Sequence, residues 1–252
     1  IEADLSRALE RQELVRHYLP KIVRHGISSV GVEALIRWRH PERGLVPPSA
    51  FIPVAEDCGL ILPIGRWALR EACLQTQAWR QAGLPPITIA VNTSALEFSA
   101  PDFLANIRAT LEETCLEPRY LEFELTESVL MRDAEFTNAV LHALADLGVK
   151  LAIDDFGTGY SSLSYLRQFP IHTLKIDQSF VNRIADNPDD ATIVSAVINM
   201  GKSLKLRVIA EGVETPEQHA FLMAQYCDEG QGFYFSLPVP AENFATLLQT
   251  GL

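Results

Sequence analysis

Short apolar runs alternate with helical patterns along most of this chain, and this alternation constrains the fold more than any other feature. Strands are expected at 87–92, 120–125, 149–154, 172–176 and 206–210, and each is followed by a helical pattern. Such alternation predicts a parallel sheet with helices outside it. The length of 252 residues is close to that of one eight-stranded α/β barrel, which we favour over an open doubly wound sheet.

The N-terminal part of the chain departs from this alternation. Residues 14–23 and 30–38 are both expected as strands, and the short turn between them makes the pair antiparallel. A last strand is expected at 230–235. Helices are expected at 2–12, 49–58, 64–81, 102–114, 138–147, 162–167, 190–204, 216–226 and 241–249. With no linker-like segment inside, residues 1–252 are expected to form a single domain.

Polar side chains stand where several of the predicted strands end. They are Asn92, Glu124, Asp154 with Asp155, Lys175 with Asp177, and Glu211. In a parallel α/β barrel the carboxyl ends of the strands converge on one face, where such barrels carry out chemistry. Several carboxylates with an amide and a lysine indicate a divalent-metal site, although Asn92 alone could equally be a turn former.

Asp154 and Asp155 are adjacent carboxylates at a predicted strand end, and a glycine-rich stretch runs from them to Ser162. Adjacent carboxylates can bridge two divalent cations, and glycines permit a tight loop. The alternative is a solvated acidic turn in which the glycines only allow the backbone to bend. Asp155-Phe156-Gly157 also matches the kinase metal-binding triplet, but the other kinase motifs are missing from the sequence.

Other acidic residues lie within or just after predicted strands. Glu122 and Glu124 are two residues apart and so share one strand face, where an interior carboxylate is costly unless paired or metal-bound. Glu33 lies in an equally apolar strand, and Arg37, four residues on, is a candidate ion-pair partner. Glu127 follows a strand and could be merely a favourable charge at a helix N-terminus.

Composition and missing motifs exclude several function classes. The net charge of −11 and pI of about 5.0 argue against a general DNA- or RNA-polymer binder, whose surface is basic. The sequence has neither a G-x-S-x-G nor an H-E-x-x-H motif, and its six histidines are scattered. Oxygen ligands favour Mg²⁺ or Mn²⁺ over Zn²⁺. Four scattered cysteines without metal-site spacing fit a reducing, cytoplasmic compartment.

An ordered set of motifs over essentially the whole chain resembles one known family. The motifs are Glu33-Ala34-Leu35, Arg37-Trp38, Asn92, Glu124 to Glu127, Asp154 to Ser162, Lys175 to Asp177, Ala210 to Glu214 and Gln231-Gly232. This set is similar to that of the EAL domain, the bacterial cyclic di-GMP phosphodiesterase. The resemblance implies an α/β fold, a modified TIM-like (β/α)8 barrel with one antiparallel strand near the N-terminus, which agrees with the predicted hairpin.

The resemblance also implies a set of metal ligands. They are Glu33, Asn92, Glu124, Asp154, Asp155 and Glu211. The first four would hold one Mg²⁺ or Mn²⁺ ion, and Asp154 would bridge to a second with Asp155 and Glu211. Two dications would supply about four positive charges, which explains how an acidic protein accepts a dianionic ligand.

Catalytic and substrate-binding roles follow from the same resemblance. Lys175 would orient or activate the attacking water, with Glu211 and Glu33 at the same centre, and the general base stays open. The substrate would meet Arg37, Gln231 and Glu214, while Glu127 would anchor the glycine-rich loop. The implied reaction is two-metal hydrolysis of cyclic di-GMP to linear 5′-pGpG. Two alternatives stay open: a catalytically weak cyclic di-GMP receptor, and another metal-dependent barrel acting on phosphates or carboxylates.

Two positions depart from the family pattern, and the wider protein is a matter of expectation. Leu19 stands where the family often has Gln, and Leu237 where it often has Lys, which bears on substrate affinity. We interpret the chain as a fragment of a longer multidomain protein, because it begins inside an amphipathic stretch. The resemblance implies a homodimer and an upstream sensory or GGDEF-type domain. The domain would be cytoplasmic, and the full-length protein could be anchored in a membrane.

Overall fold

The computed structural model describes residues 2–23, 29–130, 133–159 and 166–250. Its strands are β1 (Leu14–Val23), β2 (Ser29–His40), β3 (Gly44–Val46), β4 (Thr88–Thr93), β5 (Leu121–Thr126), β6 (Lys150–Phe156), β7 (Thr173–Ile176), β8 (Arg207–Ala210) and β9 (Glu229–Gly230). The longer helices are α1 (Glu2–Ala8), α2 (Pro48–Asp57), α3 (Ile61–Gln81), α5 (Phe103–Thr114), α7 (Ala134–Leu147), α10 (Pro188–Leu204), α11 (Pro216–Ala224) and α12 (Ala241–Thr250). Short helical segments are α4 (Ala95–Phe98), η1 (Pro118–Tyr120), α6 (Glu127–Leu130) and α9 (Gln178–Val181).

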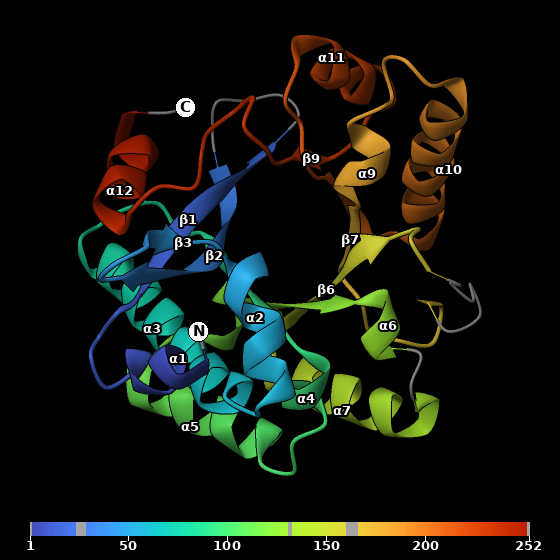
Figure 1. The fold of residues 1–252 in the computed structure, drawn as a ribbon. Coiled ribbons are helices and arrows are strands. Elements are labelled where there is room, and N and C mark those ends of the chain that lie inside the picture. Colours follow the sequence, from blue (N-terminus) through green and yellow to red (C-terminus); the bar gives the residue numbers. More distant parts are fainter. Residues whose placement is uncertain (1, 24–28, 131–132, 160–165, 251–252) are drawn as a thin grey trace.

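The strands form a closed barrel. Their order is β1-β9-β8-β7-β6-β5-β4-β2, and β2 pairs back to β1 to complete the ring. β1 is antiparallel to both of its neighbours, whereas the other pairs around the ring are parallel. In Figure 1 helices α3, α5, α7 and α10 lie outside the strands. The predicted barrel with one antiparallel N-terminal strand is therefore confirmed.

Alternation along β5 shows how the sequence builds this barrel. Leu121, Phe123 and Leu125 are fully buried in the main apolar core between the strands and the outer helices. Glu122 and Glu124 alternate with them and face the barrel interior, where both are almost inaccessible to solvent. This two-residue period places the apolar face outward against the helices and the carboxylates inward, as predicted.

The last strand is shorter than predicted. We expected a strand at 230–235, but β9 contains only Glu229–Gly230. Gly232 has φ of +150°, and a Cβ there would lie 2.3 Å from the backbone nitrogen of Val213. The chain turns at this close approach, because only glycine fits it, and the Tyr234 amide then donates to the Val213 carbonyl.

Other differences from the predicted elements are small. The sequence patterns missed β3, α4 and α6, which have three or four residues each and are too short to show a period. The helix expected at 162–167 lies largely outside the described residues. Within the described part of the chain, no helix combines the length and apolar character needed to cross a bilayer.

Candidate metal centre

The ammonium group of Lys175 lies at the centre of the predicted site, surrounded by four carboxylates. Lys175 lies in β7, and its side chain is completely buried. Its Nζ atom lies 2.7 Å from Oε2 of Glu124 and 2.7 Å from Oε1 of Glu211. It also lies 3.2 Å from Oδ1 of Asp154 and 3.5 Å from Oε2 of Glu33. Four carboxylates carried by β2, β5, β6 and the residue after β8 thus surround one atom.

Glu33 links two further predicted residues to this cluster. Its Oε1 atom accepts a hydrogen bond of 2.6 Å from Nδ2 of Asn92, and its Oε2 atom accepts one from Nε2 of Gln231. Asn92 pairs in register with Glu124 across the parallel β4–β5 ladder, so both side chains leave the sheet at the same level. Arg37, the alternative partner of Glu33, instead donates to the backbone carbonyl of Ile36 at 2.8 Å.

Asp154, Asp155 and Glu211 form a second, overlapping group. One ligand oxygen from each lies within 4.8 Å of the others, which is close enough to share an ion. Asp155 has φ of +52°, a rare left-handed conformation for a residue without glycine's freedom. Burial and the neighbouring carboxylates of Asp154 and Asp177 raise the pKa of Asp155 to about 6.

Crowding of negative charge gives the cluster its electrostatic character. Burial and the Glu33 carboxylate raise the pKa of Glu124, and burial raises the pKa of Glu211 well above its ordinary value. Burial alone would lower the pKa of Lys175, but the carboxylates around it, Asp154 foremost, raise that pKa instead. Four carboxylates facing one ammonium group carry a surplus of negative charge. An oxygen-rich donor set with that surplus fits hard divalent cations.

A second layer of charges lies deeper in the barrel, and sequence reasoning missed most of it. Lys21 of β1 is buried, and its Nζ atom donates to Oε1 of Glu122 at 2.7 Å and to Oε1 of Glu124 at 2.8 Å. Oε2 of Glu122 accepts from Nη2 of Arg207 at 2.8 Å and from Oγ1 of Thr173 at 3.1 Å. The expectation that interior carboxylates are paired is confirmed for Glu122.

Two of the predicted substrate-binding residues, Glu214 and Gln231, line a cavity at the barrel mouth. This cavity of about 300 Å³ is bordered by Glu33, Asp154, Glu211, Glu214, Gln231 and Phe233, among others. Leu19, the departure from the family pattern, also lines it, whereas Leu237 is 61% exposed. Oε1 of Gln231 is buried and has no hydrogen-bond partner among the described residues. Arg37 is half-buried, and burial lowers the pKa of its guanidinium group.

A second cavity of about 430 Å³ also borders the cluster. Asn92 and Glu124 border it, together with apolar residues of α2 and α3 such as Ile52 and Ile64. Predicted metal ligands therefore line two cavities, Asn92 and Glu124 the larger one and Glu33, Asp154 and Glu211 the other.

Glu127 occupies the predicted position beside the glycine-rich loop. It begins α6, and its side chain is buried. Oε2 of Glu127 accepts from the Gly157 amide at 3.4 Å, and a Cβ at Gly159 would lie 3.0 Å from its Oε1. The carboxylate thus contacts the Gly157 amide and occupies the space where a side chain at Gly159 would lie. The loop residues 160–165 lie outside the described residues.

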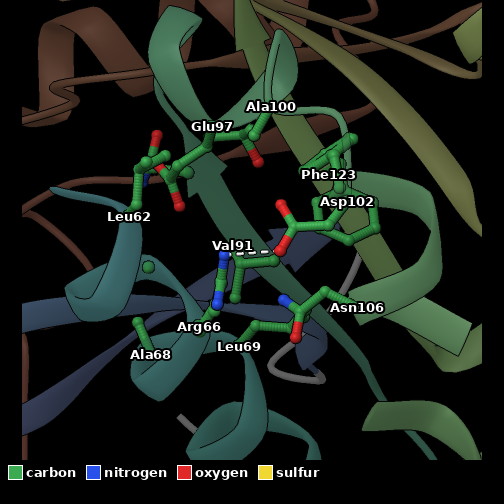
Figure 2. Close-up of a pocket in the computed structure, with 14 residues that line it drawn as sticks. Leu62, Arg66, Ala68, Leu69, Val91, Glu97, Ala100, Asp102, Asn106 and Phe123 are labelled. Atoms are coloured by element: carbon green, nitrogen blue, oxygen red, sulfur yellow. Dashed lines mark hydrogen bonds and ion pairs between the residues drawn. The ribbon is translucent and has the colours of Figure 1, made fainter. Parts of the chain in front are cut away.

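A third, much smaller cavity lies between the barrel wall and the outer helices. Figure 2 shows it bordered by Arg66 and Leu69 of α3, Val91 of β4 and Asp102, with Nη2 of Arg66 2.6 Å from Oδ2 of Asp102. Its volume of about 40 Å³ has room for little more than ordered water. We interpret it as a packing gap rather than a ligand site.

Comparison with known proteins identifies the family. The family model described as the EAL domain matches residues 2–238. The chain belongs to the EAL domain family. The resemblance drawn from the ordered motifs is therefore confirmed, and the convergent residues named above belong to an EAL barrel.

Two named relatives are similar in sequence to almost the whole of this chain. The bifunctional diguanylate cyclase/cyclic di-GMP phosphodiesterase MucR of Pseudomonas aeruginosa is 48% identical over 239 residues, covering 95% of this chain and 35% of MucR. The cyclic di-GMP phosphodiesterase PdeR of Escherichia coli is 42% identical, covering 97% of this chain and 37% of PdeR. The chain thus spans about a third of the length of these relatives.

Solved structures agree with the fold. A structure described as the PaMucR phosphodiesterase in complex with c-di-GMP matches with a TM-score of 0.93 at 47% identity, covering 96% of this chain and 98% of the other. The EAL enzyme Bd1971, in a form with cAMP and cyclic di-GMP bound, matches with a TM-score of 0.92 at 33% identity. It covers 98% of this chain and 68% of the other.

Proposed function

We propose that this EAL domain hydrolyses one phosphodiester bond of cyclic di-GMP, giving the linear dinucleotide 5′-pGpG. The observation that carries the proposal is the convergence of Glu33, Asn92, Glu124 and Asp154 at the mouth of the barrel. MucR and PdeR are 48% and 42% identical to this chain over nearly its full length, and both names include cyclic di-GMP phosphodiesterase.

The donor set supports two Mg²⁺ or Mn²⁺ ions as cofactors. Glu33, Asn92, Glu124 and Asp154 would hold one ion, and Asp154, Asp155 and Glu211 would hold the other. Ions bound there would supply Lewis acidity, polarising the scissile phosphodiester and lowering the pKa of the attacking water. A carboxylate cluster with surplus negative charge is also a poor host for a phosphate by itself, so cations are needed for substrate binding.

The chain's own side chains position the reactants. Lys175 is held by four carboxylates, and in the proposal its ammonium group donates a hydrogen bond that orients the attacking water. Oε1 of Gln231, which has no hydrogen-bond partner among the described residues, lies on the amide that contacts Glu33, and it would accept a hydrogen bond from the same water. In the proposal Glu211, which lies 2.7 Å from Nζ of Lys175 and beside the ion site, accepts the proton that the water releases.

The two cavities suit a ligand with two similar halves. A cyclic dinucleotide carries two nucleosides joined by two phosphates, so one nucleoside could occupy each cavity with a phosphate at the carboxylate cluster. In the proposal the half-buried Arg37 meets a phosphate, and Glu214, which lines the cavity of about 300 Å³, meets the substrate. The cavity on the α2–α3 side is largely apolar, as expected for a surface that receives a flat base.

Incubation of the purified chain with cyclic di-GMP and either Mg²⁺ or Mn²⁺ tests the proposal. We expect a linear product by chromatography and mass spectrometry, and none when EDTA replaces the metal. Tight binding without turnover would instead show a cyclic di-GMP receptor. Equal rates on cyclic di-GMP and on bis(p-nitrophenyl) phosphate would instead show a metal-dependent barrel of broader specificity.

The proposal extends to the full-length protein. We propose a homodimer in a longer polypeptide that carries a sensory or GGDEF-type domain before this one, as the name of MucR as a diguanylate cyclase and phosphodiesterase suggests for that relative. Because cyclic dinucleotides are intracellular messengers in this interpretation, the domain would face the cytoplasm. Sedimentation analysis of the chain at several concentrations would test the dimer.

A further inference from the structure

Lys21 has no role in the reaction proposed above, yet it is, with Lys175, one of two buried lysines among the described residues, and it lies below the carboxylate cluster. It lies on β1, and its residue is 2% exposed. Its Nζ atom donates at 2.8 Å to Oε1 of Glu124, and the second oxygen of that carboxylate accepts from Lys175 at 2.7 Å. The Glu124 carboxylate is therefore held at both oxygens, by Lys21 on one side and by Lys175 on the other.

Glu122, which lies deeper in the barrel than Glu124, holds the side chain of Lys21 in place. Its Nζ atom also donates at 2.7 Å to Oε1 of Glu122, whose Oε2 accepts at 2.8 Å from Arg207. Charges thus follow one another from Arg207 through Glu122 and Lys21 to Glu124. Each of these three ion-pair contacts is 2.8 Å or shorter, which is typical of charge-assisted hydrogen bonds.

The neighbouring strand leaves space for the lysine stem. Lys21 pairs across the β1–β2 ladder with Gly31, which has no side chain. A Cβ at Gly31 would lie 3.5 Å from Cδ of Lys21 and 3.1 Å from the carbonyl oxygen of Thr88. The stem passes over this glycine and carries the ammonium group into the barrel interior, where Glu122 and Glu124 point.

We infer that Lys21 is a positioning residue for the metal centre: it anchors Oε1 of Glu124 so that Oε2 stays directed at the barrel mouth. The inference rests on the proposed function, because it takes Glu124 as a metal ligand. A carboxylate already held in its binding orientation loses less conformational freedom when a cation arrives. Groups that hold metal ligands in this way typically contribute about 10- to 100-fold to metal affinity.

The sign of the effect separates positioning from simple electrostatics. Lys21 carries a positive charge close to a cation site, so removal of that charge alone would strengthen the binding of a divalent cation. Removal of the anchor would weaken it. Weaker binding after substitution of Lys21 is therefore the result that only the positioning role predicts.

The experiment measures Mn²⁺ binding by isothermal titration calorimetry and by electron paramagnetic resonance of free Mn²⁺, without substrate. For Lys21→Met we expect the dissociation constant to rise about tenfold or more. Arg207→Met is the matched control, because Arg207 contacts Glu122 but lies two contacts further from Glu124 than Lys21 does. We expect this control to lower the melting temperature and to leave the dissociation constant unchanged.

A double variant covers the case in which Lys21→Met does not fold. Lys21→Met combined with Glu122→Gln removes the lysine together with one acidic partner, and it should bind Mn²⁺ as weakly as expected for the single variant. Unchanged or tighter Mn²⁺ binding in a folded Lys21 variant would overturn the inference. Equal weakening in Arg207→Met, or failure of both Lys21 variants to fold, would also overturn it by assigning Lys21 to barrel stability. Failure of the unsubstituted chain to bind Mn²⁺ would instead defeat the proposed function.

Discussion

Glu33 shows how much one side chain can connect at the mouth of this barrel. Its carboxylate accepts hydrogen bonds from Asn92 of β4 and from Gln231 after β9, and it lies 3.5 Å from the ammonium group of Lys175. Burial alone would raise the pKa of Glu33, but the charges of Lys175 and Lys21 and the hydrogen bond from Gln231 together lower that pKa. The carboxylate is therefore kept ionised, which is the form that binds a cation.

Substitution of Glu33 by alanine should remove most of the turnover. The change deletes one proposed metal ligand, so we expect kcat for cyclic di-GMP to fall by more than about 100-fold and Mn²⁺ binding to weaken. The control is Glu229→Ala, because Glu229 is an equally buried carboxylate that pairs with Arg207 below the cluster. A rate for Glu33→Ala equal to that of the control would show that the ligand assignment is wrong.

Some residues of the site could be found from sequence, and others could not. Asn92, Glu124, Asp154 and Lys175 were predictable because each stands at the end of an apolar strand, and the strand ends of a barrel converge on one face. Lys21 was not, because a lysine beside Pro20 in a strand looks like an edge residue facing solvent. Its burial depends on Glu122 and Glu124, which are about a hundred residues away in the chain.

At the scale of elements, the connection of β5 to β6 controls the loop beside the site. β5 ends at Thr126, and α6 begins directly with Glu127, which places a buried carboxylate under the backbone of Gly157 and Gly159. Two interpretations of Glu127 remained open from sequence, a loop anchor and a helix N-terminal charge. The structure places it in both positions, so a functional measurement is needed to separate them.

Replacement of Glu127 by alanine should therefore affect metal dependence rather than stability alone. A hydrogen bond to a charged group is worth about 1.5 kcal/mol or more, so the Mn²⁺ concentration for half-maximal rate should rise roughly tenfold. Glu135→Ala is the control, because Glu135 is an exposed glutamate in the first turn of α7. If both variants show the same metal titration as the unsubstituted chain, Glu127 acts only as a helix charge.

The elements themselves were predictable to different degrees. Strands from β4 to β8 followed from apolar runs bounded by turns, because a buried parallel strand needs a continuous apolar sequence. The same rule predicted the last strand too long, because Phe233 to Phe235 continue the apolar run. These residues follow Gly232, whose backbone packs on Val213. Only the tertiary contact at Gly232 ends β9, and no local pattern reports that contact.

For the whole molecule, closure of the barrel is what converts separate motifs into one site. β1 pairs with β2 on one side and β9 on the other, which brings residues near both ends of the chain into one ring. Gln231 and Glu33 are hydrogen-bonded although 198 residues separate them. A site that depends on closure should exist only in the folded chain, and cation binding should then stabilise the fold.

Melting temperatures with and without metal test this coupling. A ligand that binds only the folded state at 100 times its dissociation constant adds about 2.7 kcal/mol of stability. For a chain of this size, that amount should raise the melting temperature by roughly 5–10 °C. We expect the increase with Mn²⁺ for the unsubstituted chain and not for Glu33→Ala. An equal increase in both proteins would place the stabilising ion elsewhere.

Anomalous diffraction from crystals grown with Mn²⁺ and cyclic di-GMP tests the central claim most directly. The account predicts two anomalous peaks at the barrel mouth, one bounded by Glu33, Asn92, Glu124 and Asp154 and the other by Asp154, Asp155 and Glu211, with a phosphate of the ligand beside them. Peaks only at other acidic surfaces, or a cyclic di-GMP molecule bound away from these side chains, would contradict it.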